Sequence, residues 1–104
     1  MQISVQIISM CRYNSKTDNK EKIRIDYICN EEKYLSDKEK FRGYPQITVY
    51  LNDHIEENWN LLDVGLVGKP VDLVFEKVPS LTNPTREYNR LKQICTKNGN
   101  ISIL

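Results

Sequence analysis

The chain has 104 residues, of which 39% are hydrophobic and 28% charged, and its net charge is +1. This composition predicts one soluble globular domain spanning residues 1–104, with a single modest core. No apolar run approaches the roughly 20 residues of a membrane-spanning helix, and the N-terminus lacks the features of a signal peptide. We therefore expect a cytoplasmic protein with no membrane partner.

The charges are distributed unevenly along the chain. Residues 1–24 carry five basic and two acidic side chains, residues 25–76 carry five basic and eleven acidic, and residues 77–104 carry five basic and one acidic. If the two ends of the chain meet in space, they form a positive face opposite an acidic pole. A solvated surface without a partner explains the same pattern, so both interpretations stay open at this point.

The first half of the chain alternates between apolar and polar residues, as half-buried strands do. This pattern predicts strands over residues 3–13 and 23–29, joined through the polar and turn-rich residues 14–22. The charged segment 30–45 follows, and residues 46–52 form a third predicted strand.

A helix is expected after the third strand. Asp53 is placed to cap this helix, with Glu56 completing a capping box. Apolar residues recur at helical spacing around Trp59, which favours a core role for that ring. Gly65 and Gly68 are expected to end the helix.

The second half of the chain contains the clearest strand pattern, over residues 69–78. The segment 79–85 holds two prolines and is expected to be a loop. Asn98-Gly99 is a strong hairpin signal and requires extended chain on both sides, which predicts a strand from Arg90 onward and a short final strand in 101–104. A helix over residues 87–94 remains the alternative.

If residues 86–94 are extended, strand periodicity distributes their side chains over two faces. Tyr88, Arg90 and Lys92 then share one face. The opposite face then carries Leu91, Gln93 and Cys95. A ring, a guanidinium and an ammonium in one row suit a nucleic-acid backbone.

The order of these elements predicts the fold class. Three strands, a helix, two strands and a short final strand indicate a mainly β protein. The specific prediction is an OB-like, five-stranded antiparallel Greek-key barrel with one short helix between strands 3 and 4.

At the level of this pattern, three segments resemble strands of small OB-fold proteins from phages and conjugative elements that bind single-stranded DNA. The segments are "GYPQITVYLN", "GKPVDLVFEKV" and "NRLKQI". The resemblance implies a binding surface on the second and third strands, with the loops between strands one and two and between strands four and five. It implies DNA binding without sequence specificity, in the replication or transfer of a phage or conjugative transposon. The chain departs from that family because the tip of its first loop has no aromatic residue.

Single-stranded nucleic acid is bound by cations that follow the phosphates and by flat rings on which bases stack. The candidate contacts are the cations and the rings that could serve these two roles. They are Arg12, Tyr13, Lys16, Lys22, Arg24, Tyr44, Tyr50, Lys77, Arg86, Tyr88, Arg90 and Lys92. Cross-strand packing is the alternative role for each tyrosine. Tyr27 is assigned to the core instead, because its position in the alternation places it with buried residues.

Catalysis is not predicted. The single histidine, His54, stands at the expected helix start without a nucleophile motif, and "GLVGKP" lacks the glycine spacing of a phosphate loop. The cysteines have no C-x-x-C spacing, so no metal and no cofactor are expected.

Two classes of function therefore follow from the sequence. The first is single-stranded nucleic acid binding, with DNA favoured over RNA and with a helicase or polymerase as a candidate protein partner. The alternative is a protein–protein interaction module of a phage or conjugative element that binds no nucleic acid and uses a sheet edge or the acidic middle segment. Homodimer formation stays open in both.

Overall fold

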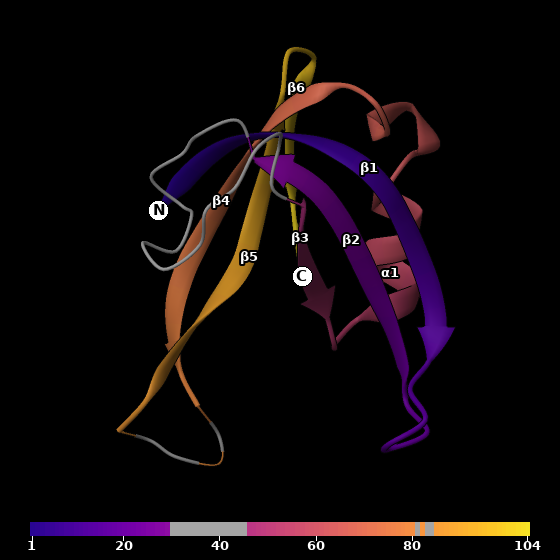
Figure 1. Cartoon of the computed structure of the whole chain (residues 1–104), viewed down its shortest axis with the longest axis vertical. Coiled ribbons are helices and arrows are strands. Elements are labelled where there is room, and N and C mark those ends of the chain that lie inside the picture. Colours follow the sequence, from indigo (N-terminus) through magenta and orange to yellow (C-terminus); the bar gives the residue numbers. More distant parts are fainter. Residues whose placement is uncertain (30–45, 81, 83–84) are drawn as a thin grey trace.

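The computed structural model describes residues 1–29, 46–80, 82 and 85–104. These residues form one antiparallel six-stranded sheet with the strand order β3-β2-β1-β4-β5-β6, together with one short α-helix (Figure 1). The elements are β1 (Gln2–Asn14), β2 (Glu21–Cys29), β3 (Gln46–Leu51), α1 (Ile55–Leu61), a 3-10 helix η2 (Val64–Leu66), β4 (Pro70–Pro79), β5 (Glu87–Thr96) and β6 (Gly99–Ser102). The mainly β prediction and the place of the helix between the third and fourth strands are confirmed.

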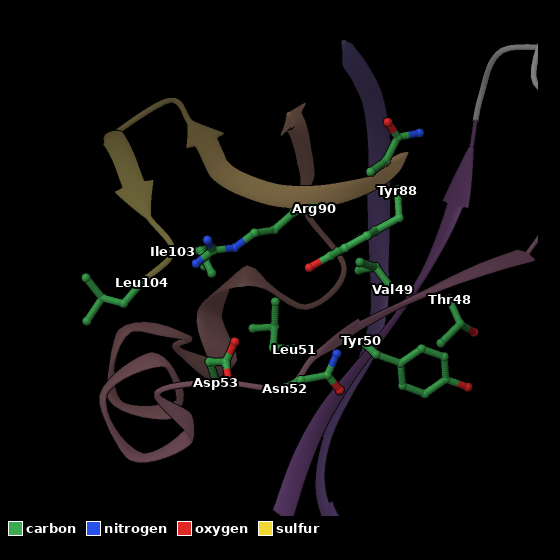
Figure 2. Close-up of a pocket in the computed structure, with 11 residues that line it drawn as sticks. Thr48, Val49, Tyr50, Leu51, Asn52, Asp53, Tyr88, Arg90, Ile103 and Leu104 are labelled. Carbon is green, nitrogen blue, oxygen red and sulfur yellow. The ribbon is translucent and has the colours of Figure 1, made fainter. Parts of the chain in front are cut away.

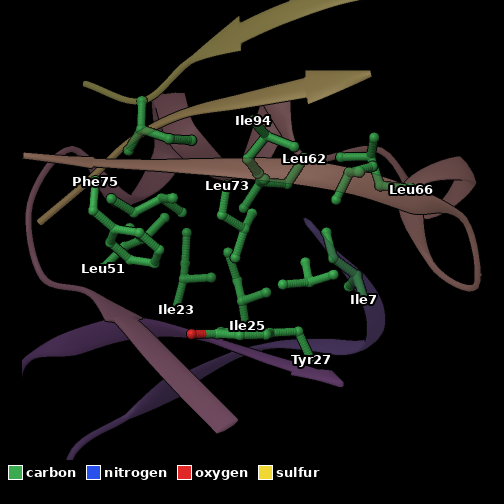
Figure 3. Close-up of a cluster of buried hydrophobic side chains, with 14 of the residues drawn as sticks. Ile7, Ile23, Ile25, Tyr27, Leu51, Leu62, Leu66, Leu73, Phe75 and Ile94 are labelled. Atoms are coloured by element: carbon green, nitrogen blue, oxygen red, sulfur yellow. The ribbon is translucent and has the colours of Figure 1, made fainter. Parts of the chain in front are cut away.

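Strand β1 joins the two halves of the sheet. Its N-terminal residues 2–6 pair with β4, and its residues 5–14 pair with β2. The register of the β1–β2 pairing shifts between Ile7 and Ser9, and a bulge of this kind bends a strand. The sheet therefore curls, and its two halves face each other across the core (Figure 3).

The core forms from the alternating residues of these strands, as the sequence predicted. The buried apolar side chains are Ile3, Val5, Ile7, Ile23, Ile25, Tyr27, Cys29, Leu51, Leu62, Leu66, Val71, Leu73, Phe75, Leu91, Ile94 and Ile103. Tyr27 is 4% exposed, which confirms its place in the core. Burial raises the pKa of its phenol to about 12, because the charged form loses its hydration.

The predicted OB-like barrel is not confirmed. The sheet has six strands rather than five, and it is open within the residues that the structure describes, with β3 and β6 as its edge strands. An opening lies between β3 and the first half of β5, because β6 pairs with β5 only from Gln93 onward.

The predicted capping box of the helix is wrong. Helix α1 begins at Ile55, and its N-cap is His54, which has the left-handed backbone angles φ 51° and ψ 47° and makes no side-chain capping bond. Asp53 therefore lies one residue before the cap position. Trp59 is partly buried and packs against the core, as expected.

The region 87–96 is a strand, and the helical alternative is wrong. Its hairpin with β6 turns at Lys97 and Asn98, so that Thr96 faces Gly99. Gly99 has φ 138°, a conformation that residues with a Cβ rarely adopt, which explains why glycine stands there.

The predicted row of Tyr88, Arg90 and Lys92 is interrupted by a bulge. Val74 faces Gln93 and the next β4 residue, Phe75, faces Leu91, so Lys92 is an extra residue with no β4 partner. After the bulge the alternation of side chains shifts by one residue. Ile94 is therefore buried together with Leu91, whereas the sequence predicted Gln93 and Cys95 on the face of Leu91.

Candidate nucleic-acid interface

Four of the predicted contacts share the outer face of the β1–β2–β3 half of the sheet. Tyr13 pairs with Lys22 across β1 and β2, and Arg24 pairs with Tyr50 across β2 and β3. The residue between Lys22 and Arg24 in β2, Ile23, is fully buried, so these side chains project to the opposite side of the sheet.

A buried carboxylate organises this outer face. Asp26 is 7% exposed and accepts hydrogen bonds from the hydroxyl of Ser9 at 3.0 Å and from that of Thr48 at 2.6 Å. Arg24 Nε lies 3.3 Å from its Oδ2 atom. The hydrogen bond from Thr48, followed by those from Ser9 and the charge of Arg24, lowers the pKa of Asp26. The network therefore links β1, β2 and β3 through charge-assisted bonds.

Several of the predicted cations are paired within the molecule. Lys22 lies 3.3 Å from Asp18, and Arg24 is paired with Asp26 as above. Backbone hydrogen bonding from Lys20, and then the ammonium of Lys22, lowers the pKa of Asp18. The positive charge of this face is thus partly compensated.

Arg12, also a predicted contact, lies on the side of the sheet opposite the four contacts of the outer face. It pairs in register with the buried Ile23, and its Nη2 atom lies 2.7 Å from Glu21 and 2.6 Å from Glu56 of α1. Hydrogen bonds to Glu21 and then to Glu56 raise the pKa of its guanidinium. Arg12 therefore ties the β1–β2 hairpin to the helix.

Two hairpin arms project from the same end of the molecule, on either side of β3 (Figure 1). The tip of the β1–β2 arm carries exposed Lys16, and the β4–β5 arm carries exposed Lys77 and Arg86. In the part of the chain that the structure describes, none of these three cations forms an ion pair. The loop of the second arm is closed by a hydrogen bond from Ser80 N–H to the carbonyl of Arg86.

A cleft of about 280 Å³ separates β3 from β5. It is lined by the consecutive residues 48–53, by residues 88–90, and by Ile103 and Leu104. Figure 2 shows Tyr88 and Arg90 extending from β5 into this cleft, whereas Thr48 and Tyr50 project from β3 away from it, to the outer face. Tyr50 and Tyr88 are 52% and 50% exposed, so each ring has a free surface.

One residue missed by the sequence analysis holds two lining residues of the cleft, Asp53 and Leu104, in place. Asn58 of α1 is fully buried, and its Nδ2 atom donates to the carbonyls of Asp53 at 3.0 Å and Leu104 at 3.3 Å. Its Oδ1 atom accepts from the N–H of Leu104 at 2.9 Å. The side chain amide therefore fixes the chain after β6 against the helix.

The remaining predicted contacts are not brought together. Lys92 is exposed at the β5 bulge and does not line the cleft. Tyr44 lies outside the described residues. The outer face, the arms and the cleft thus hold different parts of the predicted set, and Arg12 and Lys92 belong to none of the three.

A second hollow of about 480 Å³ lies between η2 and the β5–β6 hairpin, and the lysines Lys69 and Lys97 are among its lining residues. None of its lining residues is a predicted nucleic-acid contact. Among residues 1–29, 46–80, 82 and 85–104, no group of three or more side chains suited to metal binding is found. No helix among them is long and apolar enough to cross a membrane.

Comparison with known proteins gives no relationship on which to transfer a function. No family model, no curated protein and no solved structure matches the chain.

Proposed function

We propose that this protein binds single-stranded DNA with little sequence preference, along the outer face of β2 and β3 and between the two hairpin arms. The observation that carries the proposal is the position of three cations, Lys16, Lys77 and Arg86, on arms that flank β3. Within the described residues these three form no ion pair. The replication or transfer of a mobile genetic element is the setting that the sequence resemblance suggests for this activity.

Electrostatics supports a role for the arms. A cation that is already paired with a carboxylate releases few counterions on binding a phosphate, whereas a free cation contributes its full charge. The arm cations are free within the described residues, and Lys22 and Arg24 are not. We therefore assign the phosphate contacts mainly to the arms.

The outer face supplies a surface for bases. Tyr50 is half-exposed there beside Arg24, and Tyr13 lies on the same face two strands away. Stacking of a base on such a ring contributes about 1–3 kcal/mol and tolerates every base. The arrangement therefore favours binding without sequence preference.

The direct test is a fluorescence titration of a labelled oligo-dT at a series of salt concentrations. We expect binding that weakens steeply as salt rises, since phosphate contacts release counterions. An oligo-dT that stays unbound at low salt overturns the proposal. A duplex of equal length should bind more weakly, and an oligo-U titration compares DNA with RNA.

Two matched variants test the assignment to the arms. Replacing Lys16, Lys77 and Arg86 together by alanine should reduce the slope of log K against log salt by about two, because each single-strand phosphate contact contributes about 0.7. Replacing Lys69 and Lys97, which lie at the second hollow, should leave the slope unchanged. A loss of about 1.4 in the slope of the second variant, in proportion to its two lost charges, would show that net charge alone drives binding.

A further inference from the structure

The cleft between β3 and β5 is bordered by the edges of two strands. A pocket over the face of a sheet is lined by every second residue of a strand, because side chains alternate between faces. Here the lining includes every residue from 48 to 53 and every residue from 88 to 90. The cleft is therefore open to the backbone of both strands.

These edges carry no partner strand within the described residues. β3 pairs only with β2, and residues 87–91 of β5 pair only with β4, since β6 begins its pairing at Gln93. The sequence of β3, QITVYL, contains neither a charge nor a proline, the usual features that protect a sheet edge from pairing. Both walls of the cleft thus offer backbone donors and acceptors.

We propose that an extended strand of a partner protein inserts into this cleft and pairs with β3 on one side and β5 on the other. Such strand addition obtains its affinity from main-chain hydrogen bonds and its specificity from alternate side chains. An extended segment has two free edges and can pair with β3 and β5 at once, whereas the edge strand of a second folded copy of this domain has only one free edge.

The lining of the cleft defines the chemistry of the partner strand. One side of the inserted strand faces the apolar residues Val49, Leu51 and Ile103. The guanidinium of Arg90 extends into the cleft and forms no ion pair among the described residues. The partner segment therefore alternates apolar residues with polar ones and carries a carboxylate opposite Arg90. This surface is separate from the DNA-binding surface proposed above and does not rest on it.

The probe for this proposal is a blocked peptide of alternating valine and glutamate, about six residues long like β3. Hydrogen exchange followed by NMR should show that those amides of β3 and of residues 88–90 that face the cleft become at least about tenfold more protected when the peptide binds. The same peptide with every second amide N-methylated should lose this effect, because it cannot pair on one edge.

Charge reversal tests the assigned carboxylate. Arg90→Glu should weaken the valine–glutamate peptide at least about tenfold and strengthen a valine–lysine peptide, since a buried like-charge contact is unfavourable. The control Lys92→Glu reverses a neighbouring exposed charge outside the cleft and should change neither affinity. Circular dichroism confirms that both variants are folded.

Several outcomes overturn the proposal. Absence of peptide binding at about 1 mM is one, and equal binding of the N-methylated peptide is another. Self-association through β3 that the peptide does not reverse would assign the edge to a second copy. Protection of the same amides by oligo-dT, with none by the peptide, would assign the cleft to nucleic acid.

Discussion

The outer face of β1–β2–β3 and the cleft between β3 and β5 each contain an arginine, and the two arginines differ in their partners. On the outer face, Arg24 is held by Asp26, and Asp26 is satisfied by the hydroxyls of Ser9 and Thr48. In the cleft, Arg90 and the edges of two strands have no partner among the described residues. The charged groups of the outer face are therefore satisfied within the molecule, whereas the guanidinium of the cleft forms no ion pair among the described residues.

This difference indicates which cations are the better candidates for contacting a ligand. An arginine with a carboxylate at hydrogen-bond distance already has its charge compensated, so it contributes more to the fold than to binding. Arg12, with two carboxylates, is the extreme case here. Unpaired groups at a cleft or on an arm are better candidates, because binding costs them no internal partner.

The largest expected effect is on stability at the cleft, through Asn58. Asn58→Ala removes three hydrogen bonds to the main chain of Asp53 and Leu104 at a fully buried position, which should lower the free energy of unfolding by about 2–4 kcal/mol. Urea denaturation measures this change. The exposed neighbour Asn60, replaced by alanine, should cost much less. Comparable losses in the two variants would show that the buried amide is unimportant.

The next largest effect concerns the network of hydrogen bonds and charges around Asp26 on the outer face. Asp26→Asn should destabilise the fold by about 1–3 kcal/mol, since it removes the charge that Arg24, Ser9 and Thr48 stabilise. The exposed Asp63→Asn serves as the control. Urea titrations of both variants should reveal a clear difference.

The same carboxylate predicts a pH dependence. The pKa of Asp26 is lower in the folded protein than its ordinary value of 3.8. Its contribution to stability is therefore fully present above pH 3.8 and is lost as the pH falls through the lower folded value. Acid denaturation of the wild type should show this loss, and Asp26→Asn should show less of it. Parallel curves for the two proteins would contradict the assignment.

The sequence predicted the core well, because burial on one face of a strand leaves a direct pattern. Ile23, Ile25 and Tyr27 alternate in the sequence and are all buried. The glycine of Asn98-Gly99 likewise revealed the β5–β6 hairpin, since its backbone conformation has few alternatives.

Features that depend on contacts between distant segments left no such pattern. The bulge at Lys92 adds one residue to β5 without an unusual residue type, so the shift of its alternation was not visible. Arg12 and Glu56 are 44 residues apart. Asn58 is a polar residue in a short helix, and two of its three hydrogen bonds depend on the approach of Leu104, which is 46 residues away. The cleft exists because the sheet does not close between β3 and β5, a property of the assembled fold.

A third effect concerns DNA binding by the outer face. Tyr50→Ala should weaken oligo-dT binding by about 1–3 kcal/mol if a base stacks on the ring, with an unchanged salt slope because no charge is lost. Tyr50→Phe should retain most of the affinity. A full loss in the phenylalanine variant would point to a hydrogen bond from the hydroxyl instead.

The smallest effect separates the two regions by their ligands. Lys16→Ala should reduce the salt slope for oligo-dT by about 0.7, because the exposed arm cation meets a phosphate. Arg90→Ala should leave that slope unchanged and weaken only the valine–glutamate peptide, since its guanidinium lies in the cleft. Titrating both variants with both ligands gives a complete comparison. If Arg90→Ala reduces the slope as Lys16→Ala does, the cleft and the arms belong to a single nucleic-acid surface, because a phosphate then reaches the residue that we assign to a peptide.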